Sequence, residues 1–258
     1  MCGISGVIGI RSEAEARPVL EAMNEAIAHR GPDDSGYYVG EGVAFGQRRL
    51  SIIDLSSAGH QPMVSPDGNL VLIFNGEIYN YRELKQELKE YPFQTQTDTE
   101  VILAAYLRWG RDCVERFNGM FAFALWDKQA GEVLIFRDRL GIKPLYYYRK
   151  DDLLLFSSEL RALLNSNLVP RKLNTAALSD YLRYQTVHAP QTMVEGVQML
   201  LPGHVISIRD HKMTIEQYWS PEHNFSQEAV GKSYEEVKRD VHELLLQSVE
   251  RRLIADVP

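Results

Sequence analysis

Short hydrophobic runs separated by turn residues recur along the first two-thirds of the sequence, and they predict a protein rich in β-strands. The apolar run 4–10 is punctuated by glycines, which predicts a buried strand with close backbone neighbours. Gly131 and the pair Asp151-Asp152 supply turns between later strands. The other predicted strands are 36–39, 43–47, 70–74, 120–126, 132–137, 145–148, 153–156, 204–208 and 213–218.

Apolar positions spaced three and four residues apart predict helices at several places between these strands. The predicted helices are 19–28, 81–89, 99–109, 160–165 and 176–184. Asp98 directly precedes the third of them and is suited to cap its N-terminus. Because strands come first at the N-terminus and again in the middle, with helices in between, the element order favours an α+β sandwich over a doubly wound parallel sheet.

The C-terminal part of the sequence follows a different pattern. Residues 220–232 read as a polar linker, and Ser233 opens a strongly amphipathic helix. Large apolar residues lie along one face of that helix: Val237, Val241, Leu244, Leu245, Val249 and Leu253. Such a face requires a partner surface. Two partners remain open: the sandwich itself, or a second domain of which 233–258 is the first helix. An uncovered face would favour aggregation or a homodimer.

Composition excludes several classes of protein. The net charge is −7 and no basic block is present, which argues against binding to nucleic acid or to a membrane surface. The sequence has neither an apolar run long enough to span a membrane nor a signal peptide. Two cysteines, Cys2 and Cys113, form no disulfide framework, so we expect a cytoplasmic protein with Cys113 as a core thiol.

Ligands for metals and phosphates are not patterned in this sequence. The seven histidines show no metal-ligand spacing with either cysteine, and the glycine-containing stretches lack a phosphate-binding loop. We therefore expect neither a metal nor another cofactor in this chain.

Cys2, directly behind Met1, is the most distinctive chemical feature. Once Met1 is removed, this residue carries a thiol and a free α-amine together. An α-amine titrates near ~7.7–8 and can accept the thiol proton at neutral pH. Terminal nucleophiles of this kind are activated by their own amine. Taken alone, a cysteine at position 2 is more often incidental than catalytic, so the hypothesis depends on the rest of the chain.

Nine sequence blocks, in order, resemble the glutaminase domain of glutamine-hydrolysing asparagine synthetases, a class II (N-terminal nucleophile) glutamine amidotransferase. The resemblance covers roughly residues 2–219 and implies a four-layer αββα sandwich of two mainly antiparallel sheets. It also implies that ammonia from glutamine passes to a synthetase domain that uses Mg-ATP to convert aspartate to asparagine. The blocks are 2–4, 29–33, 49–54, 75–80, 97–100, 118–124, 137–147, 156–160 and 201–204.

The resemblance also implies roles for individual residues. Cys2 is the nucleophile, with its α-amine as base, and it forms a thioester with the substrate. Asn75 and Gly76 form the oxyanion hole, through a side-chain amide and a backbone N–H. The substrate-binding residues are Arg49 for the α-carboxylate of L-glutamine, and Glu77 and Asp98 for its α-ammonium.

Simpler readings of the same residues remain open. Asn75-Gly76 on its own is typical of a hairpin turn, Asp98 of a helix cap, and an arginine at position 49 of a surface charge, although Arg48 fits that last description better. Gln47 stands where relatives frequently carry histidine. The other hypotheses are an amidotransferase with another acceptor, such as a sugar or peptide acid, and a non-catalytic glutamine-binding module.

Overall fold

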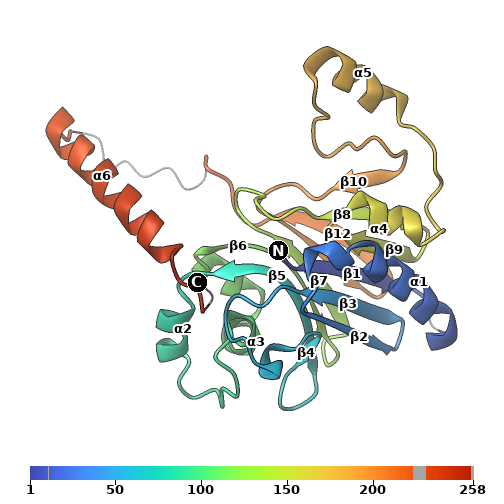
Figure 1. The fold of residues 1–258 in the computed structure, drawn as a ribbon, viewed down its shortest axis with the longest axis horizontal. Helices are drawn as coiled ribbons and strands as arrows, with labels where there is room; N and C mark the ends of the chain where they lie inside the picture. The colour runs from blue at the N-terminus through green and yellow to red at the C-terminus, as the bar shows by residue number, and fades with distance from the viewer. Residues whose placement is uncertain (11, 223–230, 257–258) are drawn as a thin grey trace.

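Two antiparallel sheets form the centre of the protein (Figure 1). The structure is a computed structural model and describes residues 1–10, 12–222 and 231–256. In strand order, the first sheet comprises β10 (Val197–Met199), β8 (Tyr146–Lys150), β9 (Leu153–Ser157), β1 (Gly3–Ile8), β3 (Val43–Arg49) and β2 (Asp34–Gly40). The second comprises β12 (Lys212–Gln217), β11 (His204–Arg209), β7 (Glu132–Arg137), β6 (Gly119–Asp127), β5 (Leu70–Ile78) and β4 (Met63–Val64).

Helices cover the outer face of each sheet. Helices α1 (Glu13–Ala26) and α4 (Leu160–Asn165) pack on the first sheet. Helices α2 (Tyr81–Glu87) and α3 (Asp98–Trp109) and the 3₁₀ segment η3 (Gly110–Arg116) pack on the second. The predicted four-layer αββα sandwich is therefore confirmed. The other helical elements are η1 (Ala28–Arg30), η2 (Ser57–Gly59), α5 (Thr175–Tyr184) and α6 (Tyr234–Arg251).

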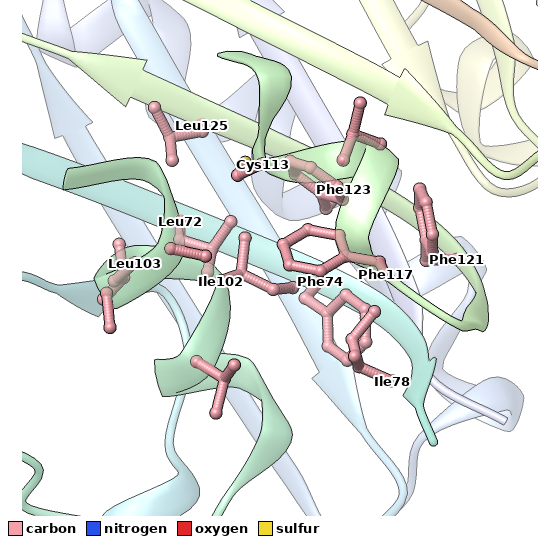
Figure 2. Packing of buried hydrophobic residues seen from close by; sticks show 14 of the residues in the cluster. Leu72, Phe74, Ile78, Ile102, Leu103, Cys113, Phe117, Phe121, Phe123 and Leu125 are labelled. Carbon is pink, nitrogen blue, oxygen red and sulfur yellow. The ribbon is translucent and has the colours of Figure 1, made fainter. Parts of the chain in front are cut away.

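Alternation along the strands creates two separate hydrophobic layers around the second sheet. On β5, Val71 and Ile73 point toward the first sheet, while Leu72 and Phe74 point toward the helices. Figure 2 shows the helix-side layer, where Phe74, Phe117 and Phe123 pack among aliphatic side chains. Cys113 lies in this layer with no exposed surface, which confirms the expected core thiol.

The sequence predicted most of the α-helices and β-strands, with errors of boundary and two missed strands. Helix α1 begins at Glu13, before the predicted start at 19, because Pro18 is accommodated inside the helix. Strands β4 and β10, of two and three residues, were not predicted. The pair Asn75-Gly76 lies within β5, paired with β6, so the hairpin-turn reading is wrong.

Helix α6 projects from the body of the molecule (Figure 1). Its predicted start is confirmed, because Ser233 forms a capping box with Glu236. Every residue of the helix is at least partly exposed, and Leu244 and Leu245 on its apolar face are more than 60% exposed. The sandwich therefore does not cover this face. Most of the predicted linker 220–232 lies outside the described residues.

Candidate active site

One pocket of about 210 Å³ gathers all six residues that the sequence singled out. It lies where β1 begins and β3 ends, beside the last residues of β5 and the first of α3. A volume of this size suits a small metabolite rather than a nucleotide. The six residues are Cys2, Arg49, Asn75, Gly76, Glu77 and Asp98.

A larger cavity of about 480 Å³ lies at the opposite ends of the same strands. Ile8, Val43 and Trp126 are among its lining residues, together with the turns between hairpin strands. None of the six predicted site residues borders it. The smaller pocket is therefore the candidate active site, since chemistry depends on the groups gathered there rather than on volume.

Cys2 is held at the edge of the pocket by contacts to its sulfur and to its backbone carbonyl. The Leu50 N–H donates to Sγ at 3.4 Å, and the Leu50 carbonyl lies 3.5 Å from the same sulfur. Arg30 donates from Nε to the Cys2 carbonyl at 2.8 Å and pairs with Glu159 at 3.1 Å. Burial raises the pKa of the Cys2 thiol, so the free pocket favours the neutral form. A thiol in this setting requires a base to become nucleophilic.

Asn75 presents a buried amide to the same pocket. It lies on β5 in phase with Val71 and Ile73, so its side chain faces the space between the sheets. The residue has no exposed surface, and neither Nδ2 nor Oδ1 has a hydrogen-bond partner among the described residues. Buried polar groups are nearly always paired, so this amide is a donor and an acceptor available to a ligand.

The Gly76 N–H points to the open edge of β5. Asp138 exchanges hydrogen bonds with the Phe121 backbone, so Phe121 faces β7, and its register partner Gly76 faces away from β6. On that same edge, Phe74 N–H donates to Gln61 Oε1 at 2.7 Å and Ile78 N–H to Asp98 Oδ2 at 2.9 Å. The Gly76 N–H thus lies between these two acceptors, beside the pocket.

Glycine is required at position 76 because the neighbouring strand leaves no room for a side chain. An added Cβ would lie 2.3 Å from the Met120 carbonyl oxygen and 2.8 Å from Phe121 Cα. The neighbouring strand β6, rather than a ligand, therefore excludes a side chain here.

Arg49 lines the pocket with a guanidinium that is already oriented by the loop that follows it. Nη1 donates to the Ser56 carbonyl at 2.8 Å, and Nη2 donates to the Asp54 carbonyl at 2.5 Å. A guanidinium has five N–H donors, so donors remain for a carboxylate. Arg48 instead contacts α1, donating to the Asn24 carbonyl and pairing with Glu25. The structure thus places Arg49, and not Arg48, at the site.

Two carboxylates line the part of the pocket between β5 and α3. Thr97, not Asp98, is the N-cap of α3, because its Oγ1 accepts from the Glu100 N–H at 3.2 Å. The capping interpretation of Asp98 is therefore wrong, and its Oδ2 instead accepts from Ile78 on β5. Burial raises the pKa of Asp98 to about 7. Burial also raises the pKa of Glu77, and the ammonium of Lys143 opposes that rise.

Lys143 is a pocket residue that sequence reasoning did not single out. It is 4% exposed and lies on a loop fixed by the residues that precede it. Asp138 Oδ2 accepts from the Lys143 N–H at 3.0 Å, and Arg137 Nε donates to the Lys143 carbonyl at 2.9 Å. Its only sequence signal was its position within the block 137–147.

The segment after α6 reaches back to the loop beside the pocket. The Asp256 N–H donates to the Ile52 carbonyl at 2.9 Å, and Asp256 Oδ2 accepts from the Asp54 N–H at 2.8 Å. Arg252 lies over the Tyr79 ring, 5.0 Å from its centroid. Residues 252–256 therefore brace the loop whose carbonyls orient Arg49.

Two kinds of feature are absent from residues 1–10, 12–222 and 231–256. No group of three or more His, Cys, Asp or Glu in that part of the chain is arranged to hold a metal ion. None of its helices is both long enough and apolar enough to cross a membrane.

Comparison with known proteins gives a consistent set of relatives. Glutamine-hydrolyzing asparagine synthetase 1 of Bacillus subtilis is 38% identical over 264 residues, covering 100% of this chain and 41% of that protein. Amidase chry2 of Gibberella zeae is 34% identical over 272 residues, covering 100% of this chain and 40% of that protein. The chain thus spans about two-fifths of the length of these curated relatives.

Solved structures share the fold at lower sequence identity. Glutamine phosphoribosylpyrophosphate amidotransferase from B. subtilis superposes with a TM-score of 0.64 at 20% identity, covering 84% of this chain and 49% of that one. The shared fold is that of N-terminal-nucleophile hydrolases. The sequence model of the glutamine amidotransferase domain matches residues 1–219. This chain therefore belongs to the glutamine amidotransferase domain family.

Proposed function

We propose that this chain hydrolyses L-glutamine to glutamate and ammonia, with Cys2 as the nucleophile and a thioester as the intermediate. The observation that carries the proposal is the Asn75 amide, which borders the Cys2 pocket without a partner among the described residues. A carbonyl oxygen that becomes negative during attack would supply that partner. Family membership and the gathering of all six predicted residues support the same reaction.

The reaction would follow from the positions of these groups. The α-amine of Cys2 takes the thiol proton, and Sγ bonds to the amide carbon of glutamine while the carbonyl electron pair moves to oxygen. The Asn75 amide and the Gly76 N–H donate to that oxyanion. Collapse breaks the C–N bond, and the ammonium returns its proton to the departing nitrogen, which leaves as ammonia. Water then cleaves the thioester and regenerates the thiol.

The free amino-acid end of glutamine needs charged partners. Arg49 retains donors for the α-carboxylate, because its loop contacts use only some of the five. Asp98 and Glu77 would hold the α-ammonium. An approaching ammonium favours the ionised form of both carboxylates and so offsets the effect of burial on them.

The proposed base exists only after Met1 has been removed. With Met1 present, the Cys2 nitrogen belongs to a peptide bond and has no basicity. A tag or a retained Met1 ahead of Cys2 should therefore abolish turnover. Processing can be read by mass spectrometry of the N-terminal peptide, and unimpaired turnover in a blocked chain would show that another group is the base.

Ammonia release from glutamine tests the proposal directly. We expect Cys2→Ala to lower the rate by at least about 1,000-fold, since the nucleophile is lost. Cys113→Ala is the matched control, because Cys113 is the other thiol of the chain and lies in the core outside the pocket. Equal rates in Cys2→Ala and wild type would refute catalysis and favour a glutamine-binding module.

The ammonia would serve a second reaction in a longer protein. Relatives named asparagine synthetases support ATP-dependent conversion of aspartate to asparagine, in which Mg-ATP belongs to a domain outside residues 1–258. In this arrangement residues 2–219 form the glutaminase domain, residues 220–232 a linker, and residues 233–258 the first helix of the synthetase domain. The whole protein would act in the cytoplasm. The exposed face of α6 supports that division, because it needs a covering surface.

A different acceptor is the second candidate. Amidase chry2 matches this chain nearly as well as the synthetase does, which favours keeping a sugar or peptide acid as the alternative. Assay of the longer protein with aspartate against other carboxylic acids separates the two. If the isolated chain forms a homodimer through α6, sedimentation at increasing concentration will show it, and a charged substitution at Leu245 should prevent it.

A further inference from the structure

Lys143 presents an unpartnered charge to the pocket. The residue is 4% exposed and lines the same cavity as Cys2 and Glu77. Among the described residues, its ammonium forms no hydrogen bond and no ion pair. Its backbone, by contrast, is bonded at both the N–H and the carbonyl. The loop therefore fixes a buried lysine at the site without using its charge for structure.

The loop that carries Lys143 is built to hold that position. Asp138 Oδ1 accepts from the Leu140 and Ile142 N–H groups at 3.1 and 3.0 Å. Arg137 donates from Nη2 to the Gly141 carbonyl at 2.7 Å. The Lys143 backbone cannot move away from the pocket without breaking several hydrogen bonds, so the loop keeps its side chain next to the pocket.

The charged groups around Lys143 come from four other parts of the fold. Cys2 and the chain's amino terminus lie at the start of β1, and Arg30 lies at the end of η1. Glu77 lies on β5 and Asp138 follows β7. Burial lowers the pKa of the Lys143 ammonium, and the ionised forms of Glu77 and Cys2 are the groups that most oppose that change. Asp98 also faces Cys2 and disfavours its thiolate.

We propose that Lys143 is a positioning residue whose ammonium favours the thiolate of Cys2 over its thiol and the carboxylate of Glu77 over its acid form, which makes the Cys2 proton easier for the α-amine to remove. The inference rests on the proposed glutaminase function for its purpose, although its electrostatic content can be measured without turnover. A cation that lines the same pocket as both groups offsets the effect of burial on their ionised forms. Lysine, a compact point charge, can serve two anions at once without a defined geometry.

Alkylation of Cys2 by iodoacetamide tests the thiolate part in the 258-residue chain. The rate is measured across pH without glutamine and is read at the Cys2 peptide by mass spectrometry. In Lys143→Met we expect the apparent pKa of Cys2 to rise by about one unit. The alkylation rate should then fall about tenfold at pH values below that pKa, where the rate follows the thiolate fraction. Lys143→Arg should keep the wild-type profile. Lys172→Met, which removes an exposed lysine paired with Glu195, is the control. Identical profiles for Lys143→Met and wild type would overturn the inference.

A reciprocal measurement covers the case in which Lys143→Met does not fold. Two interacting titrations must shift each other equally. In Cys2→Ser the acetylation profile of Lys143 by acetic anhydride should therefore move to lower pH by the same amount. An unchanged profile overturns the inference on its own.

Glutamine kinetics test the Glu77 part and separate the two proposals. The KM of Lys143→Met should rise more steeply than that of wild type as the pH falls toward 6, because Glu77 loses its charge earlier, and Lys143→Arg should restore the wild-type profile. If Lys143→Met turns over glutamine and neither its alkylation profile nor its KM profile differs from wild type, the role of Lys143 is refuted and the glutaminase proposal stands. A shifted alkylation profile without any turnover refutes the glutaminase and leaves the Lys143 assignment intact.

Discussion

Replacing Asn75 with alanine should separate catalysis from stability. The Asn75 amide has no hydrogen-bond partner among the described residues, so its removal breaks no bond within that part of the protein. It also borders the pocket, so the space left by the side chain opens toward solvent rather than forming a sealed cavity. We therefore expect the free energy of unfolding to change by no more than about 1 kcal/mol.

The catalytic effect of the same substitution should be large. An oxyanion donor is worth about 2.7–4 kcal/mol of transition-state stabilisation, which corresponds to a fall in kcat of about 100–1,000-fold. The KM for glutamine should change little, because the donor acts mainly on the charge that develops during attack. Ammonia release over a range of glutamine concentrations gives both constants, and urea denaturation gives the unfolding free energy.

Gln47→Ala provides a matched control for this experiment. Gln47 is also fully buried, also has two amide atoms without partners among the described residues, and lies outside the pocket lining. Its removal should leave kcat near the wild-type value. The assignment of Asn75 as an oxyanion donor would be wrong if Asn75→Ala kept the wild-type kcat. It would also be wrong if the unfolding free energy fell by about 3 kcal/mol, as it does when a core side chain is truncated.

Three further predictions follow from the pocket. Burial raises the pKa of Asp98 from 3.8 to about 7, so the folded chain keeps a proton that the unfolded chain releases. The unfolding free energy should therefore fall as the pH rises from about 4 to about 7. Urea titrations at several pH values should show that the unfolding free energy of Asp98→Asn depends less on pH than that of wild type, and an equal dependence would contradict the burial argument. Gly76→Ala should lower the unfolding free energy by at least about 2 kcal/mol, because its Cβ meets the Met120 carbonyl; a wild-type thermal melt would count against it. Asp256→Ala should raise the KM for glutamine by up to about tenfold, with little change in kcat, because it removes the hydrogen bond to the Asp54 N–H. An unaltered KM would show that this contact does not help to orient Arg49.

Local sequence predicted most of the helices and strands, and resemblance to a known domain pointed to the residues of the site. A glycine-punctuated apolar run predicted β1, a short apolar run predicted β5, and Ser233 predicted the start of α6. Cys2, Asn75 and Arg49 were found because their blocks resemble a known domain, and the fold brings them to one pocket. Pro18 hid the first turns of α1, because proline usually ends a helix.

Other features depend on contacts between distant segments, which no local pattern carries. Asp98 matches a helix cap in sequence, yet its carboxylate bonds to Ile78, twenty residues away. Lys143 resembles a surface lysine until Asp138 and Arg137 fix its loop against the pocket. Strand β4 has only two residues, too few to display a period.

The contact between Asp256 and the 52–54 loop has a thermodynamic consequence. Two hydrogen bonds of about 0.5–1.5 kcal/mol each join the end of the described chain to the segment that orients Arg49. Coupling between two binding equilibria is reciprocal. If residues 252–256 strengthen ligand binding by ordering the loop, a bound ligand therefore strengthens the contact of those residues with the loop by the same free energy. An interaction that displaces residues 252–256 should therefore change the affinity of the pocket for its ligand, and ligand binding should in turn strengthen the contact of these residues with the loop.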